Sequence, residues 1–577
     1  MTHDARQRPA STRSKNAPED GGQATGALAA DLRDRHRDHV RAAVRVALVC
    51  LCLFIGLSIV TGQLVRLAIL GQAPTRVAVS APISESFARP SILDRNGRPL
   101  AIDVVLPSIT ADPARILDVD EAVAKLGTVL SPADMRGLRE KLANRSSRFA
   151  WVARKVSTAL AERINNIGLP GITFRWETKR TYPQGTLAGH VLGAVNADNK
   201  GVAGLERHLD HARGLRHADR LGLSDRPALR TTLDIGVQHA TEQELLQAVA
   251  DFAAKGGAAL IMDVETGAIR AAASVPTVDP AFPETWVTDG PVDRVQAGSY
   301  ELGSVMKIAT IAMALDTNIA GLDTLVAAHE PLAVGSTTFS DGPARRAPLT
   351  VADVFLKSSN VGVGRLVRAA GTAQQRAFLS RIGLIGPMAT EARALGLVAT
   401  PGHWGDVEAV TIAYGHGISV SPLQFAATAA ALINGGLAVQ PTFIGGRQLP
   451  AGLAKRVVSS ETSAALRGLM RANVATDAGS GSRARVAGLR VGGKTGTADR
   501  LGPTGRYDGA NVTTSFLAAY PMEAPRYVVM VTLFSPKRTD ASDGERSAAF
   551  NAAPTAGRII ARTAPLLGVY PNRPPAP

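Results

Sequence analysis

Three short stretches of the chain carry side chains that could act together on an acyl group. The first is "SVMK", which places Ser304 three residues before Lys307; no other lysine in the chain has a serine three positions upstream. Positions i and i+3 share one face of a helix, so the Lys307 amine can reach the Ser304 hydroxyl. A serine hydroxyl is a weak nucleophile until a base takes its proton, and a buried lysine with a lowered pKa can be that base. The spacing predicts a serine nucleophile with a lysine general base.

The other two stretches strengthen this prediction, because Ser-x-x-Lys alone also fits an ordinary helix start. "SSN" holds Ser358 and Asn360, whose hydroxyl and amide can face one cleft. "KTGT" holds Lys494, a fixed positive charge, and Gly496, which on a strand lets a substrate backbone lie close. Lys-Thr-Gly occurs once in the chain, whereas Ser-x-Asn recurs at residues 14–16. The three motifs in this order are the set shared by penicillin-binding proteins and class A β-lactamases.

The chain as a whole resembles the class B penicillin-binding proteins, which are bitopic peptidoglycan D,D-transpeptidases. Besides the three motifs, the resemblance includes "RPSILDRNGRPLA", "RTYPQG", "GAVNADNKGVAGLE", "TLDIGVQ", "YGHGISVSPLQ" and "NGG", and it extends to about residue 560. "NADNKGVAGLE" and the absence of C-terminal repeats are most similar to the division-specific (septal) branch, and the elongation branch stays open. The chain departs from the family at Leu302, where proline is usual, and at Val305, where threonine is frequent. We expect both changes to alter the packing around Ser304 and not its chemistry.

The resemblance implies how acylation would proceed. Ser304 attacks the carbonyl of the penultimate D-alanine of a stem pentapeptide, and Lys307 accepts its proton. Ser358 relays a proton to the departing D-alanine, while Asn360 holds the substrate amide and Lys307 in place. An amine of a neighbouring stem then attacks the acyl-enzyme and completes the cross-link.

The resemblance also implies how the substrate is bound. Lys494 and Thr495 would bind the terminal carboxylate, and Gly496 would lie against the substrate backbone. The backbone N–H groups of Ser304 and Thr497 would form the oxyanion hole, and such electrostatic stabilisation is usually the largest catalytic contribution. No cofactor is expected.

An apolar run precedes all of these motifs. Residues 46–65 form twenty positions without a charged side chain, and they contain both cysteines, Cys50 and Cys52. At about 1.5 Å per residue a helix of this length spans roughly 30 Å, the hydrocarbon thickness of a bilayer. A buried core helix or a cleaved signal peptide is the alternative, but the run is long for either. Nine Lys or Arg in residues 1–45 predict a cytoplasmic N-terminus by the positive-inside rule. We expect a single-pass inner-membrane protein whose catalytic domain is periplasmic, at the division site.

The predicted fold class is α+β. Within the catalytic part, strands come first, helices in the middle and strands last, which predicts a mixed sheet in which both ends of the domain meet, with a helical subdomain. The predicted parts are a disordered basic cytoplasmic tail (1–45), the transmembrane anchor (46–65), an extended β-rich, non-catalytic pedestal of the dimerisation type (66–230), the transpeptidase domain (231–565) and a flexible tail (566–577).

Three local patterns predict individual elements. Asn96-Gly97 indicates a hairpin with a type I′ turn between two strands. Residues 257–275 read as two strands around a Glu-Thr-Gly turn. Ser421 and Pro422, with glycines just past residue 434, predict a capped helix between them.

The composition limits the partners. The net charge of +15 could attract nucleic acid, but no nucleic-acid module is present, and an exported basic domain suits anionic envelope polymers better. The histidines at 208, 211 and 217 lack the spacing and partners of a metal site, so no metal is expected. The resemblance implies peptidoglycan stem peptides as substrate, and a SEDS-family glycan polymerase with other divisome membrane proteins as partners of the anchor and pedestal. A β-lactamase and a non-catalytic scaffold are the competing classes, and covalent penicillin labelling separates all three.

Overall fold

The computed structural model describes residues 47–62, 89–212, 227–286, 293–341, 347–392, 398–446, 455–477, 479–501 and 507–571. The chain divides into two units, Met1–Glu85 and Ser86–Pro577, which are treated separately. In the first, residues 47–62 are helical. No helix among the described residues has both the length and the apolar character needed to cross a bilayer. The predicted basic tail (1–45), both flanks of the predicted anchor, His217 and residues 572–577 lie outside the described residues.

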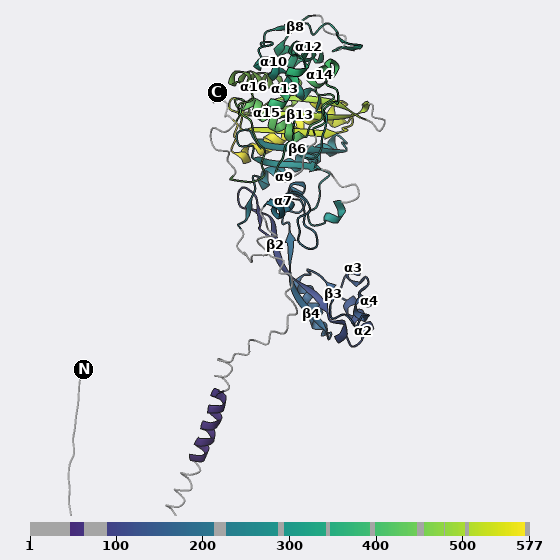
Figure 1. Ribbon diagram of the computed structural model, residues 1–577, viewed down its shortest axis with the longest axis vertical. Coiled ribbons are helices and arrows are strands. Elements are labelled where there is room, and N and C mark those ends of the chain that lie inside the picture. The colour runs from purple at the N-terminus through teal and green to yellow at the C-terminus, as the bar shows by residue number, and fades with distance from the viewer. Residues whose placement is uncertain are drawn as a thin grey trace, which may run out of the picture. The chain divides into compact units, whose positions relative to one another are not determined.

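The described part of the pedestal is built on two long paired strands. β2 and β4 run antiparallel from Ile102↔Thr181 to Ala111↔Ile172, and Figure 1 shows short helices gathered at one end of this ribbon. Buried side chains of the ribbon and the helices form one core, which includes Ile109, Leu126 and Ile164. The elements are β1 (Ile92–Leu93), β2 (Pro99–Ala111), η1 (Pro113–Arg115), α2 (Val119–Gly127), α3 (Pro132–Met135), α4 (Leu138–Ala143), β3 (Ala150–Ala153), α5 (Thr158–Ile167), β4 (Ile172–Thr181), α6 (Gly189–Leu192) and α7 (Gly204–Ala212).

The predicted hairpin is present, but the predicted turn type is wrong. β1 and β2 pair antiparallel, yet only Gly97 has a positive φ (87°), whereas a type I′ turn needs two such residues. The carboxylate of Asp94 decides the turn, because its Oδ1 atom accepts hydrogen bonds from the N–H groups of Asn96 and Arg98, both at 2.8 Å. Asp94 is fully buried, and its Oδ2 atom also accepts from the Ile235 N–H. The longer turn therefore ties the pedestal to the first helix of the next domain.

A buried ion network joins stretches of the pedestal that are distant in sequence. Glu206 of α7 is fully buried and accepts hydrogen bonds from Arg89 (2.8 Å) and Arg180 (2.6 Å). Arg180 also pairs with Asp103 at 3.1 Å, and Arg89 with Asp210. Arg89 of "RPSILDRNG" and Arg180 of "KRTYP" therefore serve to assemble the pedestal.

We expect Glu206→Ala to lower the free energy of unfolding by about 3–5 kcal/mol, because it leaves two buried guanidinium groups without their shared carboxylate. Urea or thermal unfolding measures this loss. Glu121→Ala breaks the exposed Glu121–Lys125 pair and is the control, with an expected change below about 1 kcal/mol. Equal effects of the two substitutions would contradict a structural role for the buried network.

The predicted transpeptidase domain is organised around one five-stranded sheet in the order β12-β13-β14-β6-β7. Strands from both ends of the domain meet where β14 pairs with β6, as predicted. The prediction of a mixed sheet is wrong: every pairing is antiparallel. The cause is connectivity, since β6–β7, β12–β13 and β13–β14 are consecutive strands that fold directly back on one another. The strands are β6 (Gly256–Asp263), β7 (Ile269–Val275), β12 (Gly492–Leu501), β13 (Tyr507–Tyr520) and β14 (Tyr527–Phe534).

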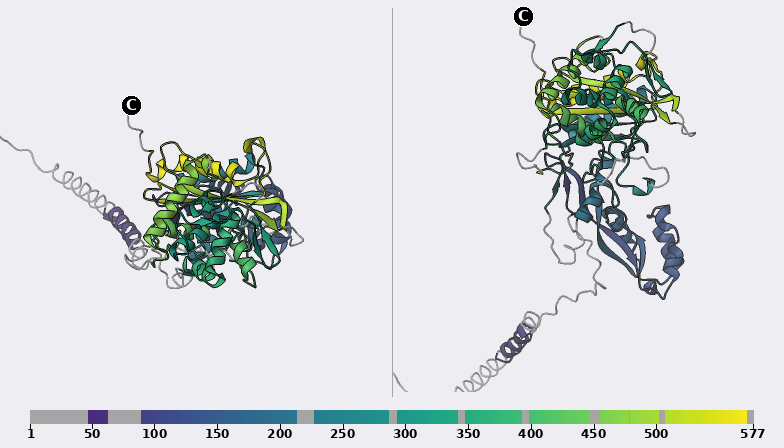
Figure 2. Two further views of the ribbon diagram at one scale, coloured as in Figure 1. Left: turned by 90° about the horizontal axis from the view of Figure 1, so that it is seen from above. Right: turned by 45° about the horizontal axis from the view of Figure 1, so that its top comes forward.

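Helices cover both faces of this sheet (Figures 1 and 2). Alternate residues of β6 separate the two cores, with Ala259 and Ile261 facing α9 (Ile235–Asp251) and α17 (Ala552–Thr563), and Leu260 facing the opposite helices. Among those, α15 (Pro422–Ile433) begins at Ser421, whose hydroxyl accepts from the Gln424 N–H, as predicted. On the same side α16 (Ser460–Ala475) packs on β12. The remaining helices pack on α16 and on one another as a helical subdomain: α10 (Lys307–Asp316), α11 (Val351–Leu356), α12 (Asn360–Ala370), α13 (Thr372–Arg381) and α14 (Asp406–Ala413).

Short elements complete the domain. The predicted strands on either side of Glu-Thr-Gly are β6 and β7, which pair antiparallel. The small strands are β8 (Leu325–Val326), β9 (Leu332–Val334), β10 (Thr337–Phe339) and β11 (Leu349–Thr350), and the short helical turns are η2 (Pro283–Trp286), η3 (Gly303–Met306), η4 (Ser482–Ala484), η5 (Asp540–Ser542), η6 (Ala548–Phe550) and η7 (Pro565–Leu567). The short strand β5 (Leu229–Arg230) belongs to the pedestal sheet, where it pairs parallel with β1.

Candidate active site

Ser304 and Lys307 lie together at a helix start. Ser304 is part of η3, and Lys307 is the first residue of α10. A 3₁₀ turn places residues i and i+3 directly above one another, so the Lys307 Nζ atom lies 2.9 Å from Ser304 Oγ. The Lys307 side chain is fully buried, whereas Ser304 is partly exposed. The predicted nucleophile and base are therefore within hydrogen-bond reach, and only the nucleophile is open to solvent.

The Ser-x-Asn motif is brought to the same amine. Besides Ser304, Lys307 Nζ contacts the Ser358 carbonyl (2.6 Å), the Ser358 hydroxyl (3.0 Å) and Asn360 Oδ1 (2.7 Å). Ser358 lies between α11 and α12 with φ at 55°, a backbone conformation that a serine seldom adopts. This backbone allows the carbonyl and hydroxyl of one residue to meet the same lysine. The lysine amine is held at the centre of four oxygen atoms.

Lys494 completes a chain of polar contacts across the site. Its Nζ atom lies 3.1 Å from the Ser358 hydroxyl, so that Ser304, Lys307, Ser358 and Lys494 follow one another within hydrogen-bond distance. Lys494 is fully buried on β12, and burial lowers its pKa to about 7. The site can therefore hold this lysine neutral or charged near neutral pH, according to what binds there.

The remaining residues of the Lys-Thr-Gly stretch have different surroundings. The Thr495 hydroxyl donates to Ser480 Oγ at 2.7 Å, and the Thr497 hydroxyl accepts from the Ala548 N–H at 3.2 Å. A Cβ atom at Gly496 would lie 2.2 Å from the carbonyl oxygen of Leu302. Gly496 was expected to admit a substrate backbone, but in the structure its missing side chain admits the turn that carries the nucleophile.

That close approach also brings the two predicted oxyanion segments together. A Cβ atom at Gly303, whose φ is 63°, would lie 2.5 Å from the Thr497 carbonyl oxygen. The backbone of η3 and the backbone of β12 are therefore in direct contact just where the N–H groups of Ser304 and Thr497 were predicted to act. Glycine is required on both sides of this contact.

Two supporting groups were missed in the sequence because their partners are distant. Asp341 accepts from the Asn360 N–H (2.7 Å) and the Val361 N–H (3.1 Å), and Ser359 Oγ also donates to it. A carboxylate at the start of α12 satisfies the first N–H groups of the helix and so fixes Asn360. On the other side of the site, Asn473 Nδ2 donates to the Gly493 carbonyl at 2.9 Å and supports β12. A local sequence pattern carries no signal for either contact.

Comparison with known proteins identifies the family. The family model described as "Penicillin binding protein transpeptidase domain" matches residues 257–557, more than half of the chain, and "Penicillin-binding Protein dimerisation domain" matches residues 85–224. The chain belongs to the penicillin-binding protein transpeptidase family. The resemblance found from the motifs is thereby confirmed.

Curated relatives and solved structures of this penicillin-binding family agree. The chain is 37% identical over 491 residues to the probable peptidoglycan D,D-transpeptidase FtsI of Caulobacter vibrioides, which covers 84% of this chain and 82% of that protein. It is 29% identical over 570 residues to peptidoglycan D,D-transpeptidase FtsI of Escherichia coli strain K12, with 92% of each chain covered. The crystal structure of penicillin-binding protein 3 of Mycobacterium tuberculosis with aztreonam superposes with a TM-score of 0.65 at 24% identity, over 85% of this chain and 98% of that one, which shows the shared fold.

This penicillin-binding protein departs from the usual family motif at Leu302 and Val305, and both side chains are buried in the main core. The distance from Lys307 Nζ to Ser304 Oγ is 2.9 Å with these residues in place. The two apolar residues are therefore compatible with a nucleophile within reach of its base.

Proposed function

We propose that this chain is a peptidoglycan D,D-transpeptidase of septal cell-wall synthesis, acting on stem peptides that end in D-Ala-D-Ala through a serine acyl-enzyme. One observation carries the proposal: Ser304, Lys307, Ser358 and Lys494 form a continuous hydrogen-bonded chain in a partly open site. The names of the curated relatives support the same activity.

Acylation follows from this chain of contacts. Ser304 Oγ attacks the carbonyl carbon of the penultimate D-alanine, and its proton passes to Lys307 Nζ at 2.9 Å. The N–H groups of Ser304 and Thr497 stabilise the negative charge that develops on the carbonyl oxygen. When the peptide C–N bond breaks, the leaving D-alanine amine takes a proton that Lys307 returns through the Ser358 hydroxyl, 3.0 Å away. The products are an acyl-serine ester and free D-alanine.

Cross-linking reverses the proton path. The amine of a second stem peptide attacks the ester carbonyl and loses a proton towards the same Lys307–Ser358 pair. The ester C–O bond then breaks, and Ser304 Oγ recovers its proton as the new peptide bond forms. The same groups act first as base and then as acid in both halves of the reaction.

The test is a reaction with labelled penicillin and with a D-Ala-D-Ala peptide. We expect stoichiometric covalent labelling that persists over hours, and release of D-alanine with formation of a cross-linked product when an acceptor amine is supplied. Rapid turnover of penicillin would instead identify a β-lactamase, and absence of labelling would identify a non-catalytic scaffold.

Lys494 gives a pH-dependent prediction. With its pKa at about 7 in the free protein, Lys494 is mostly neutral at pH 8. A bound terminal carboxylate favours the charged form, so its pKa must rise on binding and a proton must be taken up. Calorimetry of a D-Ala-D-Ala peptide with the Ser304→Ala variant, in buffers of different ionisation enthalpy, should show uptake approaching one proton at pH 8 and little at pH 5.5.

Lys494→Met is the control for this measurement, because it removes the titrating amine and should abolish the uptake at pH 8. Equal proton uptake by the two variants would show that another group titrates. If the Ser304→Ala protein, which retains Lys494, takes up no proton on binding the peptide, the terminal carboxylate is bound elsewhere.

We also propose that the protein is anchored in the inner membrane by residues 46–65, with its N-terminus in the cytoplasm and its catalytic domain in the periplasm at the division site. The support is the uncharged run with nine basic residues before it. Within the described residues 47–62, apolar side chains are widely exposed, Leu53 and Phe54 by 68% and 69%, as expected of residues that face lipid.

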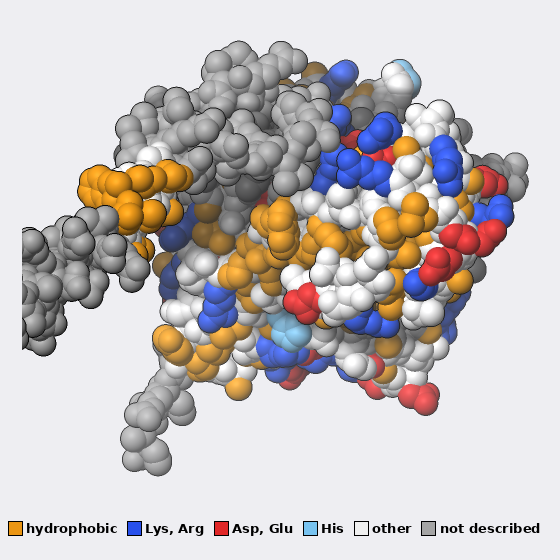
Figure 3. All heavy atoms as spheres, turned by 90° about the horizontal axis from the view of Figure 1, so that it is seen from below, with side chains coloured by type: hydrophobic (Ala, Val, Ile, Leu, Met, Phe, Trp, Pro, Cys, Tyr) orange, Lys and Arg blue, Asp and Glu red, His pale blue; other side chains and the backbone are white. Residues whose placement is uncertain are grey.

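The proposed partners are a SEDS-family glycan polymerase and other divisome membrane proteins. Two surfaces could receive them. In the anchor, Ser58 and Gly62 are four residues apart, so they share one helix face and permit close approach of a second helix. In the pedestal, exposed apolar side chains include Trp176 (62%) and Val105 (59%), and Figure 3 shows apolar side chains gathered on the face that it views.

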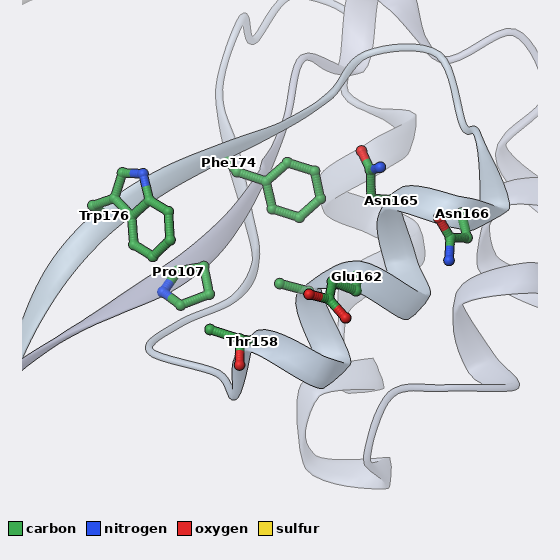
Figure 4. A pocket seen from close by; sticks show the side chains of 8 residues that line it. Pro107, Thr158, Glu162, Asn165, Asn166, Phe174 and Trp176 are labelled. Carbon is green, nitrogen blue, oxygen red and sulfur yellow. The ribbon is translucent and has the colours of Figure 1, made fainter.

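The pedestal surface includes a cavity of about 420 Å³ between α5 and the β2–β4 ribbon. Figure 4 shows Pro107, Phe174 and Trp176 along one wall and Glu162 with two asparagines along the other. Such a cavity suits an apolar side chain of an exported partner segment that also carries a basic residue for Glu162, the one charged group in its lining.

Replacing both Ser58 and Gly62 with leucine should leave insertion intact, because nothing lies within 4 Å of a Cβ at Gly62 and the change adds apolar surface. We expect co-purification with the polymerase and septal function to fall. Trp176→Ala is the matched variant for the pedestal. If the anchor variant retains partner binding and the Trp176 variant loses it, the helix is a tether and the contact lies in the pedestal.

A further inference from the structure

A second group of polar side chains meets directly before the nucleophile. Glu301, three residues ahead of Ser304, is mostly buried. Its Oε1 atom accepts hydrogen bonds from the Gly417 N–H (2.8 Å) and from the Tyr507 hydroxyl (2.9 Å), and its Oε2 atom lies 3.6 Å from Nδ1 of His416. One carboxylate thereby joins the nucleophile segment, the turn that follows α14 and the first residue of β13.

The two segments that Glu301 joins to the nucleophile segment are both connected to the active site. The turn after α14 touches the nucleophile segment a second time, where the Gly303 N–H donates to the Gly415 carbonyl at 3.3 Å. A Cβ atom at Gly415 would lie 2.1 Å from the Gly303 carbonyl oxygen, so the two backbones are in contact. Tyr507 pairs with Leu501 in the β12–β13 hairpin, whose first strand carries Lys494.

Aromatic rings extend the same connection. The His416 ring lies 5.5 Å from both Tyr507 and Tyr414, and Tyr414 lies 6.5 Å from Phe339 of β10. Burial and the charge of Glu301 raise the pKa of Tyr507 to about 12, so its hydroxyl stays protonated and donates at neutral pH. This row of rings links the β12–β13 hairpin with the small strand β10.

We propose that Glu301 is a positioning residue for acylation, which holds the turn carrying Ser304 against the β12–β13 hairpin, with Tyr507 as its hydrogen-bond partner. This inference rests on the proposed function, because it concerns the same reaction. The turn η3 has no side-chain cap of its own, so its position depends on contacts of this kind. Displacing a reacting group by about 1 Å can slow a reaction about 10²-fold.

The experiment separates acylation from binding and from folding. For the full-length protein, the dissociation constant of penicillin (Ks), the acylation rate constant (k2) and Tm are measured in Glu301→Ala, Glu301→Gln and Tyr507→Phe. We expect Tyr507→Phe to lower k2 about tenfold, the loss of one hydrogen bond to a charged group, with Ks unchanged and Tm lowered by no more than about 3 °C. Glu301→Gln keeps an acceptor oxygen for both donors, so its k2 should lie well above that of Glu301→Ala. The double variant Glu301→Ala/Tyr507→Phe should be no slower than Glu301→Ala alone.

Tyr570→Phe, which removes a hydroxyl from a tyrosine that is 71% exposed, is the matched control and should keep the wild-type k2. The proposal is overturned by a wild-type k2 in Tyr507→Phe, by additive losses in the double variant, or by a Glu301→Gln protein as slow as Glu301→Ala. If Glu301→Ala does not fold, Tyr507→Phe and Glu301→Gln still decide. Failure of the wild-type protein to be acylated would contradict the proposed function instead.

Discussion

Ser304→Ala should abolish covalent penicillin labelling completely while leaving the protein folded. The substitution removes one oxygen from a partly exposed residue of η3, which has no side-chain cap to lose. Lys307 keeps three of its four oxygen partners, from Ser358 and Asn360, so burial of its amine remains compensated. We therefore expect Tm to change by only a few degrees, as judged by thermal unfolding alongside the gel assay for labelling.

Ser299→Ala is the matched control, since Ser299 is a nearby serine whose hydroxyl is buried and neither donates nor accepts a hydrogen bond among the described residues. Its labelling should equal that of the wild-type protein. Residual labelling of Ser304→Ala, located on another residue by peptide mapping, would show that Ser304 is not the nucleophile and would remove the basis of the assigned motif.

Lys307→Arg should slow acylation about 10²- to 10⁴-fold, the range that a positioned general base contributes. A guanidinium group keeps the positive charge but stays protonated in proteins, so it cannot accept the Ser304 proton. The measurement is the acylation rate constant of a slow-reacting β-lactam, together with Tm, because the larger side chain enters a fully buried site.

Lys357→Arg is the control for this exchange, because Lys357 is an exposed lysine next to Ser358 in sequence and pairs with Asp353. It should acylate at the wild-type rate. A folded Lys307→Arg protein that also acylates near the wild-type rate would mean that the lysine supplies only a positive charge, and the base would have to be sought elsewhere.

The amino-acid sequence was enough to predict the reacting groups and several local elements. A serine three residues before a lysine is a local relation, and a single helical turn is enough to bring Lys307 Nζ to 2.9 Å from Ser304 Oγ. The helix that begins at Ser421 and the β6–β7 hairpin were likewise readable, because caps and tight turns depend on neighbouring residues. The turn type at Asn96-Gly97 was predicted wrongly even though its cause is local, because the carboxylate of Asp94, two residues before Asn96, sets the turn.

The contacts between groups distant in sequence became visible only in the folded chain. Ser358 and Lys494 are 136 residues apart, and they touch because β14 pairs with β6 and closes one sheet from both ends of the domain. The same closure gives Gly496 its close contact with the nucleophile turn and gives Glu301 its partner Tyr507, 206 residues further on. Contacts of this kind depend on how whole elements pack, which no short window of sequence encodes. The motifs therefore specify what the site can do, and the packing of the sheet and helices sets the distances at which it does so.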